Sequence, residues 1–300
     1  MRKNGFCNAR QVLSAFIVIV FGSYVIAAQG EISGTWTSKT KEKDPDRIQI
    51  NFKRTSDTDR NHSNGSGFDV SDLQGISAGQ LVNGGGSFRI VREAGSIELN
   101  GTFTDGKGSG TFRFVPDSSY ARQMSSRGFD FEKPAKDGSS KYEERMFMAA
   151  MLDVSVALAD DLRSSNFPDL DVSDLFKAKI FKIDGKFVAE MAATGFPDLS
   201  MEDMVKARIF KINADYVRGI KDAGFGADKF EHLVKYSIFK VTPEYLAELR
   251  NEGLTALSPE EIVKLRIFKV DAAFVRDARA EDPNISVKKI VEKKIGVHTR

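Results

Sequence analysis

The sequence is poor in the residues from which most metal and catalytic sites are built. Its 300 residues include one cysteine, three histidines and one tryptophan. The cysteine, Cys7, precedes an apolar run that ends near residue 28, so a chain cleaved after this run would contain no thiol. Disulfides, cysteine-ligated metals and thiol nucleophiles are then excluded together. The histidines, at positions 62, 232 and 298, lack the spacing of a zinc site, and we expect neither a metal nor a cofactor.

The sequence also lacks an excess of charge of either sign. The 44 lysines and arginines almost balance the 42 aspartates and glutamates, and the net charge of +2 gives no reason to expect nucleic-acid binding. The chain contains no H-E-x-x-H, G-x-S-x-G or phosphate-loop motif. Most carboxylates stand at expected helix starts, where they stabilise the positive end of the helix dipole. We therefore predict a protein without catalytic residues that is not an enzyme. Hydrolase activity through paired carboxylates is the alternative that the sequence leaves open.

Residues 1–28 predict export. Three basic residues precede the apolar run and the small residues Ala27 and Ala28 end it, which is the layout of a secretory signal. Cleavage after Ala27 or Ala28 is one interpretation. An uncleaved membrane anchor is the other, because the run is close to the roughly 20 apolar residues that a spanning helix needs. In both cases we expect the remaining chain in the periplasm or outside the cell, with membrane contact only through an uncleaved segment.

Apolar and polar residues alternate between positions 31 and 115. Ile48, Ile50 and Phe52 would share one face of a strand. Residues 87–114 read as three further strands separated by two glycine-bearing turns. The pattern predicts an antiparallel β-barrel or sandwich of about six to eight short strands.

Two segments of this region are rich in glycine, asparagine and serine. We interpret both, at 55–67 and 83–86, as loops. Trp36 lies near the start of another strand. If the β domain is a receptor, Trp36 and the first loop are the residues that we expect at the mouth of its ligand site.

One phrase is repeated beyond residue 116. Ile180, Ile209, Ile238 and Ile267 each begin an Ile-Phe-Lys sequence, and the steps between them are 29 residues. Each period has room for two short helices, so we predict that 116–298 forms an α-helical repeat domain, an αα-hairpin solenoid of about six units. A β-strand at the phrase is the alternative, because apolar residues alternate there. We interpret each Ile-Phe pair as the residues that pack one unit on the next.

Capping residues predict where the helices begin and end. Thr242 is an N-cap followed by Pro243, and Gly253 ends the same helix. Ser258 and Glu261 form a capping box that opens the next helix. Equivalent boxes are expected at Asp171/Asp174, Ser200/Asp203 and Asp228/Glu231. Aromatic residues one period apart are expected in the core: Phe187, Tyr216, Tyr245 and Phe274.

Basic residues recur in register with the repeats. Residues one period apart stack in a regular solenoid, so these cations would form ladders that could bind an acidic protein or an anionic polymer. The alternative is structural, since cations near helix C-termini complement the helix dipole and cover apolar surface. The candidate partner-binding residues are Lys177, Lys182, Lys206, Arg208, Lys211, Lys235, Lys240, Lys264, Arg266 and Lys269.

Three phrases resemble a family of exported bacterial proteins that combine a small β domain with helical repeats of this length. They are VTPEYLAELRNEGL, FPDLSMEDMVKARIFKI and GTFTDGKGSGTFRFVPDSSYARQMSSRGF. Similar repeats are appended to some membrane metallopeptidases of the β-lactam-sensing, antirepressor type. The peptidase part has no counterpart here, so no catalytic residue carries over. The resemblance implies export and a sensing, scaffolding or interaction role in the cell envelope.

Two functions are consistent with these observations. The first is a non-enzymatic, monomeric scaffold whose helical array presents a surface to an envelope protein or an anionic polymer. The second is a receptor, in which the β domain binds a small molecule or glycan and the helices act as a spacer or transmitter.

Overall fold

The structure is a computed structural model that describes residues 32–41, 44–54, 63–133, 141–165, 167 and 169–296. The export segment at 1–28 and residues 55–62 of the expected first loop lie outside the described residues.

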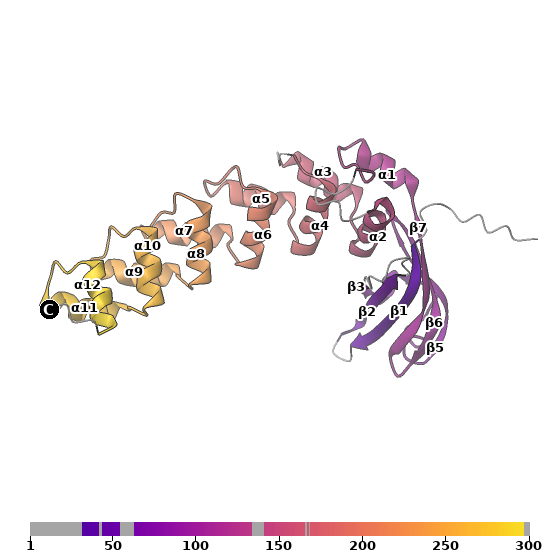
Figure 1. The fold of residues 1–300 in the computed structure, drawn as a ribbon, viewed down its shortest axis with the longest axis horizontal. Helices are drawn as coiled ribbons and strands as arrows, with labels where there is room; N and C mark the ends of the chain where they lie inside the picture. Colours follow the sequence, from indigo (N-terminus) through magenta and orange to yellow (C-terminus); the bar gives the residue numbers. More distant parts are fainter. Residues whose placement is uncertain are drawn as a thin grey trace, which may run out of the picture.

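Seven strands form a single antiparallel sheet in the order β3-β2-β1-β7-β6-β5-β4. The strands are β1 (Ile32–Lys41), β2 (Asp44–Arg54), β3 (Ser63–Asp69), β4 (Leu73–Gln74), β5 (Gly84–Arg92), β6 (Gly95–Thr104) and β7 (Lys107–Pro116). The sheet is curled into a half-barrel (Figure 1). A 3₁₀ turn at Val70–Asp72 leads directly from one edge strand, β3, to the other, β4. The antiparallel β prediction is confirmed, but a sandwich is wrong because every described strand belongs to this one sheet.

Parts of two segments that the sequence pattern places in loops are strands. Residues 63–67 pair with β2, and β5 begins at Gly84 and pairs with β6 along its whole length. Glycine occurs in β5 because neighbouring backbone lies very close. A Cβ on Gly85 would lie 2.5 Å from the carbonyl oxygen of Gly101. The composition of this segment therefore reflects close strand packing and not a turn.

Aromatic rings fill the inner face of the half-barrel. The Trp36 ring packs against Phe88 and Phe103, with ring centroids 5.6 and 5.4 Å apart. Helix α2 (Tyr142–Leu152) covers the same face, where its Phe147 stacks on Phe112 with centroids 5.5 Å apart. Phe147 also contacts Phe52, again at 5.5 Å between centroids. One side chain of the helical region thus lies in the core of the sheet.

Twelve helices follow or cover the sheet in the described part of the chain. Besides α2 they are α1 (Ser118–Ser125), α3 (Val156–Ser164), α4 (Val172–Phe181), α5 (Gly185–Ala192), α6 (Met201–Ile209), α7 (Ala214–Asp222), α8 (Phe230–Ile238), α9 (Pro243–Asn251), α10 (Pro259–Ile267), α11 (Ala272–Glu281) and α12 (Val287–Lys294). The prediction of a β region followed by an α region is confirmed.

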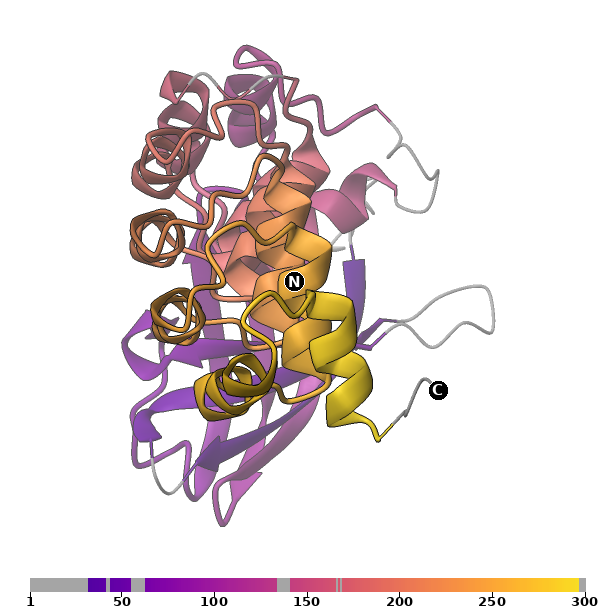
Figure 2. The same ribbon diagram turned by 90° about the vertical axis from the view of Figure 1, so that its left-hand side faces the viewer.

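The helices form an elongated array that extends away from the sheet (Figures 1 and 2). Even-numbered helices contact one another in order from α2 to α12. Among the odd-numbered helices, α1, α3 and α5 are in contact in the same way, as are α7, α9 and α11. Helices α4, α6, α8 and α10 begin at residues 172, 201, 230 and 259, which are 29 residues apart. The sequence period is therefore the period of neighbouring helices within a row.

The Ile-Phe-Lys phrase is a helix-stop signal. Its lysines have left-handed backbone conformations, with φ of 55°, 55°, 56° and 52° at Lys182, Lys211, Lys240 and Lys269. The residue that follows donates its N–H to a carbonyl five residues earlier, as Ile212 does to Ala207 at 2.8 Å. This is the hydrogen bond of the Schellman motif that ends helices. The phrase is helical, and the alternative interpretation as a strand is wrong.

The predicted packing role of the isoleucines in this phrase is wrong. Ile180, Ile209, Ile238 and Ile267 are 49–55% exposed. Their phenylalanine neighbours are half-buried, except for the exposed Phe239. The buried residues lie two positions before each isoleucine and three positions after it: Ala178, Ala207, Tyr236, Leu265, Ile183, Ile212, Val241 and Val270. The left-handed lysine turns the chain between these positions, so the buried aliphatic residue after it replaces the isoleucine in the core.

Tyrosine hydroxyl groups link the odd-numbered helices to the ends of the even-numbered ones. Tyr216 and Tyr245 donate to the carbonyls of Val241 and Val270, both at 2.8 Å. Tyr120 of α1 donates to Val154 at 2.9 Å, the equivalent carbonyl after α2. Burial of these hydroxyls raises the pKa of Tyr120, Tyr216 and Tyr245 well above the usual tyrosine value. Of the four aromatic residues expected in the core, Phe187 and Tyr245 are buried as predicted, whereas Tyr216 and Phe274 are half-buried and pack against the core.

Basic side chains near the ends of the odd-numbered helices make a second link. Arg250 donates to the carbonyl of Ala223, at 3.3 Å, and Lys221 donates to the equivalent carbonyl of Thr194. Each acceptor lies just before a glycine in the left-handed conformation, Gly224 or Gly195. These bonds satisfy carbonyls that the end of a helix leaves without an intrahelical donor.

Three of the four predicted capping boxes are confirmed, and the fourth is wrong. Asp171/Asp174, Ser200/Asp203 and Ser258/Glu261 form as predicted. Helix α8 instead begins one residue later than expected, with Lys229 as an N-cap whose side chain accepts no bond. Asp228 therefore stands outside the helix, and His232 occupies the position that an acid fills in the other boxes.

We predict that Phe147→Ala lowers the free energy of unfolding by about 3–5 kcal/mol, because it leaves a cavity in a core that sheet and helices share. The matched surface variant Ile238→Ser should change it by less than about 0.5 kcal/mol. Denaturation followed by Trp36 fluorescence reports on the sheet, and far-UV circular dichroism reports on the helices. In Phe147→Ala both transitions should shift together; a shift in only one would contradict a shared core.

We predict opposite effects for two buried tyrosines. Tyr245→Phe should cost about 1–3 kcal/mol, since it leaves the buried Val270 carbonyl without its donor. Tyr236→Phe should be neutral or stabilising, because the buried Tyr236 hydroxyl has no hydrogen-bond partner among the described residues. Urea denaturation at pH 7 measures the free energy of unfolding of both variants. Equal losses of stability would contradict a hydrogen bond at the Tyr245 hydroxyl and its absence at the Tyr236 hydroxyl.

Candidate interaction surface

The exposed isoleucines and the left-handed lysines lie at the same ends of successive helices. We call these eight residues the Ile–Lys row: Ile180, Lys182, Ile209, Lys211, Ile238, Lys240, Ile267 and Lys269. They stand at the C-terminal ends of α4, α6, α8 and α10. Because these helices contact one another in order, the row repeats one apolar and one basic side chain per helix along the array.

The lysines of the row are available for a partner. All four are exposed. Within the part of the chain that the structure describes, none of their ammonium groups forms an ion pair with a carboxylate. Each follows the last turn of a helix, where the carbonyl ends of the helix favour a cation. The row thus combines free positive charge with exposed aliphatic surface.

Two other residues of the predicted basic ladders form ion pairs within the helical array. Lys177 bonds to Asp174 at 3.0 Å and to Glu202 of the next even-numbered helix at 2.5 Å. Desolvation opposes the charged form of Lys177, but these two bonds outweigh it and raise its pKa.

Lys206 repeats this arrangement one period later. It bonds to Asp203 at 3.1 Å and to Glu231 at 2.6 Å. Its hydrogen bonds to Glu231 and Asp203 raise the pKa of the ammonium group. Lys177 and Lys206 therefore join neighbouring helices and are poor candidates for partner contacts.

The two arginines of the predicted ladders are also structural. Arg208 lies 3.6 Å from the ring centroid of Phe187 and donates to the carbonyl of Lys182 at 2.5 Å. Arg266 lies 4.7 Å from the ring centroid of Tyr245. Lys235 and Lys264 are exposed and form no ion pair within the described residues. Of the ten predicted residues, six are exposed lysines for which no ion pair and no ring contact is found within the described residues: Lys182, Lys211, Lys235, Lys240, Lys264 and Lys269.

Helix α2, the first even-numbered helix, has residues equivalent to those of the Ile–Lys row, and there the sheet covers them. Met151, Asp153 and Val154 stand 29 residues before Ile180, Lys182 and Ile183. Asp153 is left-handed at φ 56°, and Val154 bonds back to Ala149 as the later units do. Met151 is nevertheless only 4% exposed. The residue equivalent to the isoleucines of the row is therefore buried after α2, whereas the isoleucines of the next four even-numbered helices are exposed.

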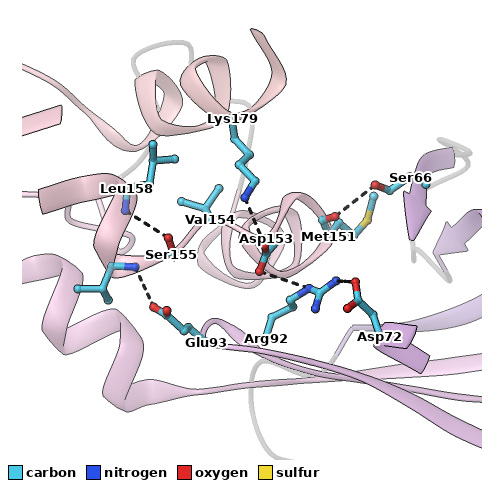
Figure 3. Close-up of polar contacts among 12 residues, drawn as sticks. Ser66, Asp72, Arg92, Glu93, Met151, Asp153, Val154, Ser155, Leu158 and Lys179 are labelled. Atoms are coloured by element: carbon cyan, nitrogen blue, oxygen red, sulfur yellow. Dashed lines mark hydrogen bonds and ion pairs between the residues drawn. The ribbon is translucent and has the colours of Figure 1, made fainter. Parts of the chain in front are cut away.

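The cover is the β-sheet, as Figure 3 shows. Ser66 of the edge strand β3 donates to the carbonyl of Met151 at 3.2 Å. Arg92, at the end of β5, lies 3.4 Å from Asp153, which also pairs with Lys179 at 3.2 Å. Where the later units carry an unpaired lysine, the first unit carries an acid with two basic partners.

Sequence reasoning missed this junction, although a signal was present. The residues MLDV at 151–154 align with IFKI at 180–183 in the 29-residue register. In this alignment Asp153 stands where the later units have a lysine, and Ala150 stands where the next unit has Lys179. These two differences mark the unit whose surface the sheet covers.

The prediction that Trp36 lies at the mouth of a ligand site in the β region is wrong. Trp36 is 1% exposed, and its ring nitrogen donates to the carbonyl of Thr111 at 3.0 Å. The ring lies inside the half-barrel because Gly101 leaves space for it; a Cβ on Gly101 would lie 2.6 Å from the ring. Trp36 therefore cannot contact a ligand from solvent.

A hollow of 590 Å³ lies on the sheet over β5, β6 and β7. Its polar side chains bond mainly to one another. Arg113 pairs with Glu98 at 2.7 Å and Asn100 donates to Ser87 at 2.9 Å. A ligand would have to replace these contacts, so the hollow offers less unpaired bonding capacity than the Ile–Lys row.

Among the described residues, no group of three or more histidine, cysteine, aspartate or glutamate side chains could hold a metal ion. No described helix is both long and apolar enough to cross a membrane. No family model matches the chain, and comparisons with curated proteins and with solved structures find no match.

We predict that Lys211→Gly leaves stability unchanged or raises it by up to about 1 kcal/mol, because glycine adopts the left-handed conformation without steric cost. The matched variant Lys235→Gly, within helix α8, should lose about 1 kcal/mol. Urea denaturation of both variants is the measurement. Equal losses would contradict a left-handed residue at 211, whereas the expected result provides a variant that removes charge without harming the fold.

Proposed function

We propose that this protein is a non-enzymatic scaffold of the cell envelope, and that its helical array binds a partner protein along the Ile–Lys row. In this proposal the array is an αα-hairpin solenoid, the 29-residue period sets the spacing of the contact points, and the half-barrel closes one end. The export of the chain belongs to the same proposal, on the basis of the signal-like residues 1–28 and the resemblance of its repeats.

The observation that carries the proposal is the repeated exposure of Ile180, Ile209, Ile238 and Ile267. Core packing does not require these side chains, since the residues two before and three after them are buried instead. Exposed aliphatic residues are common singly, and larger exposed apolar patches mark interaction sites, so the repetition of these isoleucines on neighbouring helix ends supports a binding surface. The unpaired lysines beside them favour a partner with negative charge.

The receptor alternative has weaker support. Its named aromatic residue is buried, and the side chains around the hollow on the sheet are largely satisfied by one another. The filled half-barrel is consistent with a structural role for the sheet, as the cap of the array.

We predict that a photo-crosslinking residue, such as p-benzoylphenylalanine, forms a discrete adduct with an envelope protein when it replaces Ile209. The same residue at Val82, which is 48% exposed on the β region, serves as the matched control and should form none. Adding Lys211→Gly and Lys240→Gly should reduce the Ile209 adduct at least severalfold, because both charges of the contact are lost. The readout is the mass-shifted band and its identification by mass spectrometry.

Adducts of equal yield at positions 82 and 209 would indicate non-specific capture. Absence of adducts at all four isoleucine positions, in a protein with normal circular dichroism, would reject the row as a binding surface.

A further inference from the structure

We infer that the segment bound by the Ile–Lys row is an extended, acidic stretch of the partner with an apolar side chain at every third residue. This inference rests on the proposed function and specifies the chemistry of the partner.

The first argument is spacing. Packed helices lie about 8–10 Å apart, so the exposed isoleucines of neighbouring helices in the row repeat at about that interval. An extended chain of polyproline II type completes one turn in three residues and about 9.3 Å, and three residues of a β-strand cover about 10 Å. Side chains of a β-strand alternate between its two faces, so residues three apart point in opposite directions, whereas a polyproline II segment presents every third side chain on one face, one to each helix end. Four units would then engage roughly ten residues.

The second argument is continuity with an interface that this chain already has. At the first unit, the position equivalent to the exposed isoleucines is Met151, which lies under the sheet and accepts a bond from Ser66 of β3. The occupant there is an extended strand. The same helix ends continue, uncovered, in α4, α6, α8 and α10, so an extended segment is the geometry that this surface already accommodates.

The third argument is charge. Asp153 at the first unit lies 3.4 Å from Arg92 across the interface, and Arg92 also pairs with Asp72 of the β region at 2.5 Å. In the following units the equivalent residue is Lys182, Lys211, Lys240 or Lys269, and no described carboxylate pairs with it. Because the charge at the helix end changes from negative to positive, the group that contacts it should change from positive to negative. The partner should carry an aspartate or glutamate close to each apolar residue.

Labelled peptides test the inference on the purified full chain. The probe is the twelve-residue peptide (Pro-Leu-Glu)4, whose leucines recur every third residue. The matched control has the same composition in the order (Pro-Leu-Glu-Leu-Pro-Glu)2, which breaks this spacing. Fluorescence anisotropy should give a dissociation constant at least about tenfold lower for the periodic peptide.

Variants of the protein connect that difference to the row. Ile209→Ser with Ile238→Ser, and separately Lys211→Gly with Lys240→Gly, should each weaken binding of the periodic peptide about tenfold. Val82→Ser should leave it unchanged, since it removes an equally exposed aliphatic side chain elsewhere. Raising the salt concentration should weaken binding by the parent chain more than binding by the lysine variant.

Each contrary outcome has a distinct meaning. Equal binding of both peptides, or tighter binding of oligoglutamate, would overturn the three-residue period in favour of a simple polyanion site. Preference for a helical peptide with leucine at every seventh residue, or a dimer abolished by Ile209→Ser, would replace the extended segment by a helix or by a second copy of this chain. Failure of all peptides while the Ile209 crosslink persists would reject this inference and leave the proposed function standing; loss of that crosslink as well would reject both.

Discussion

Burial of α2 from two sides is the constraint on which the rest of the molecule depends. Phe147 packs on aromatic rings of the sheet, while the other side of the helix contacts α4. The sheet and the helical array therefore belong to one continuous hydrophobic core. A row of short helices must bury its first apolar face against something, because a single helix pair cannot do so within itself. Here the half-barrel provides that cover, which fixes the direction in which the array leaves the sheet.

Much of this fold could be predicted from the sequence, because local signals and tertiary packing agree. Alternating residues such as Ile48, Ile50 and Phe52 predict a strand, and all three are buried in β2. The 29-residue period and caps such as Thr242 predict the helices and their starts. Helix α8 is the exception, since two acids three residues apart, Asp228 and Glu231, imitate a capping box that the chain does not form. The curl of the sheet and the place of α2 were not predictable, because they depend on contacts between segments far apart in sequence.

The candidate surface was only partly predictable, for a specific physical reason. Hydrophobic residues in a repeat are normally interpreted as core, and the lysine after each Ile-Phe pair looks like ordinary helix surface. A lysine in the left-handed conformation gives no sequence signal, unlike glycine, which the chain uses at the equivalent ends of the odd-numbered helices, as at Gly224 and Gly253. That one backbone conformation decides which aliphatic residue is buried. If this backbone conformation is not recognised, the exposed isoleucines are mistaken for core residues.

The choice of lysine at these helix ends is itself informative. Glycine would end each helix at a lower conformational cost, and the odd-numbered helices show that the array accommodates it. Five of the six even-numbered helices end in a charged residue: an acid after α2, where the sheet supplies Arg92, and a lysine after α4, α6, α8 and α10, whereas α12 ends at the left-handed Gly296. A requirement for helix termination alone would not distinguish these two cases. A requirement for charge complementary to the group that contacts each helix end does distinguish them, and it relates the cover of the first unit by the sheet to the partner that we propose for the others.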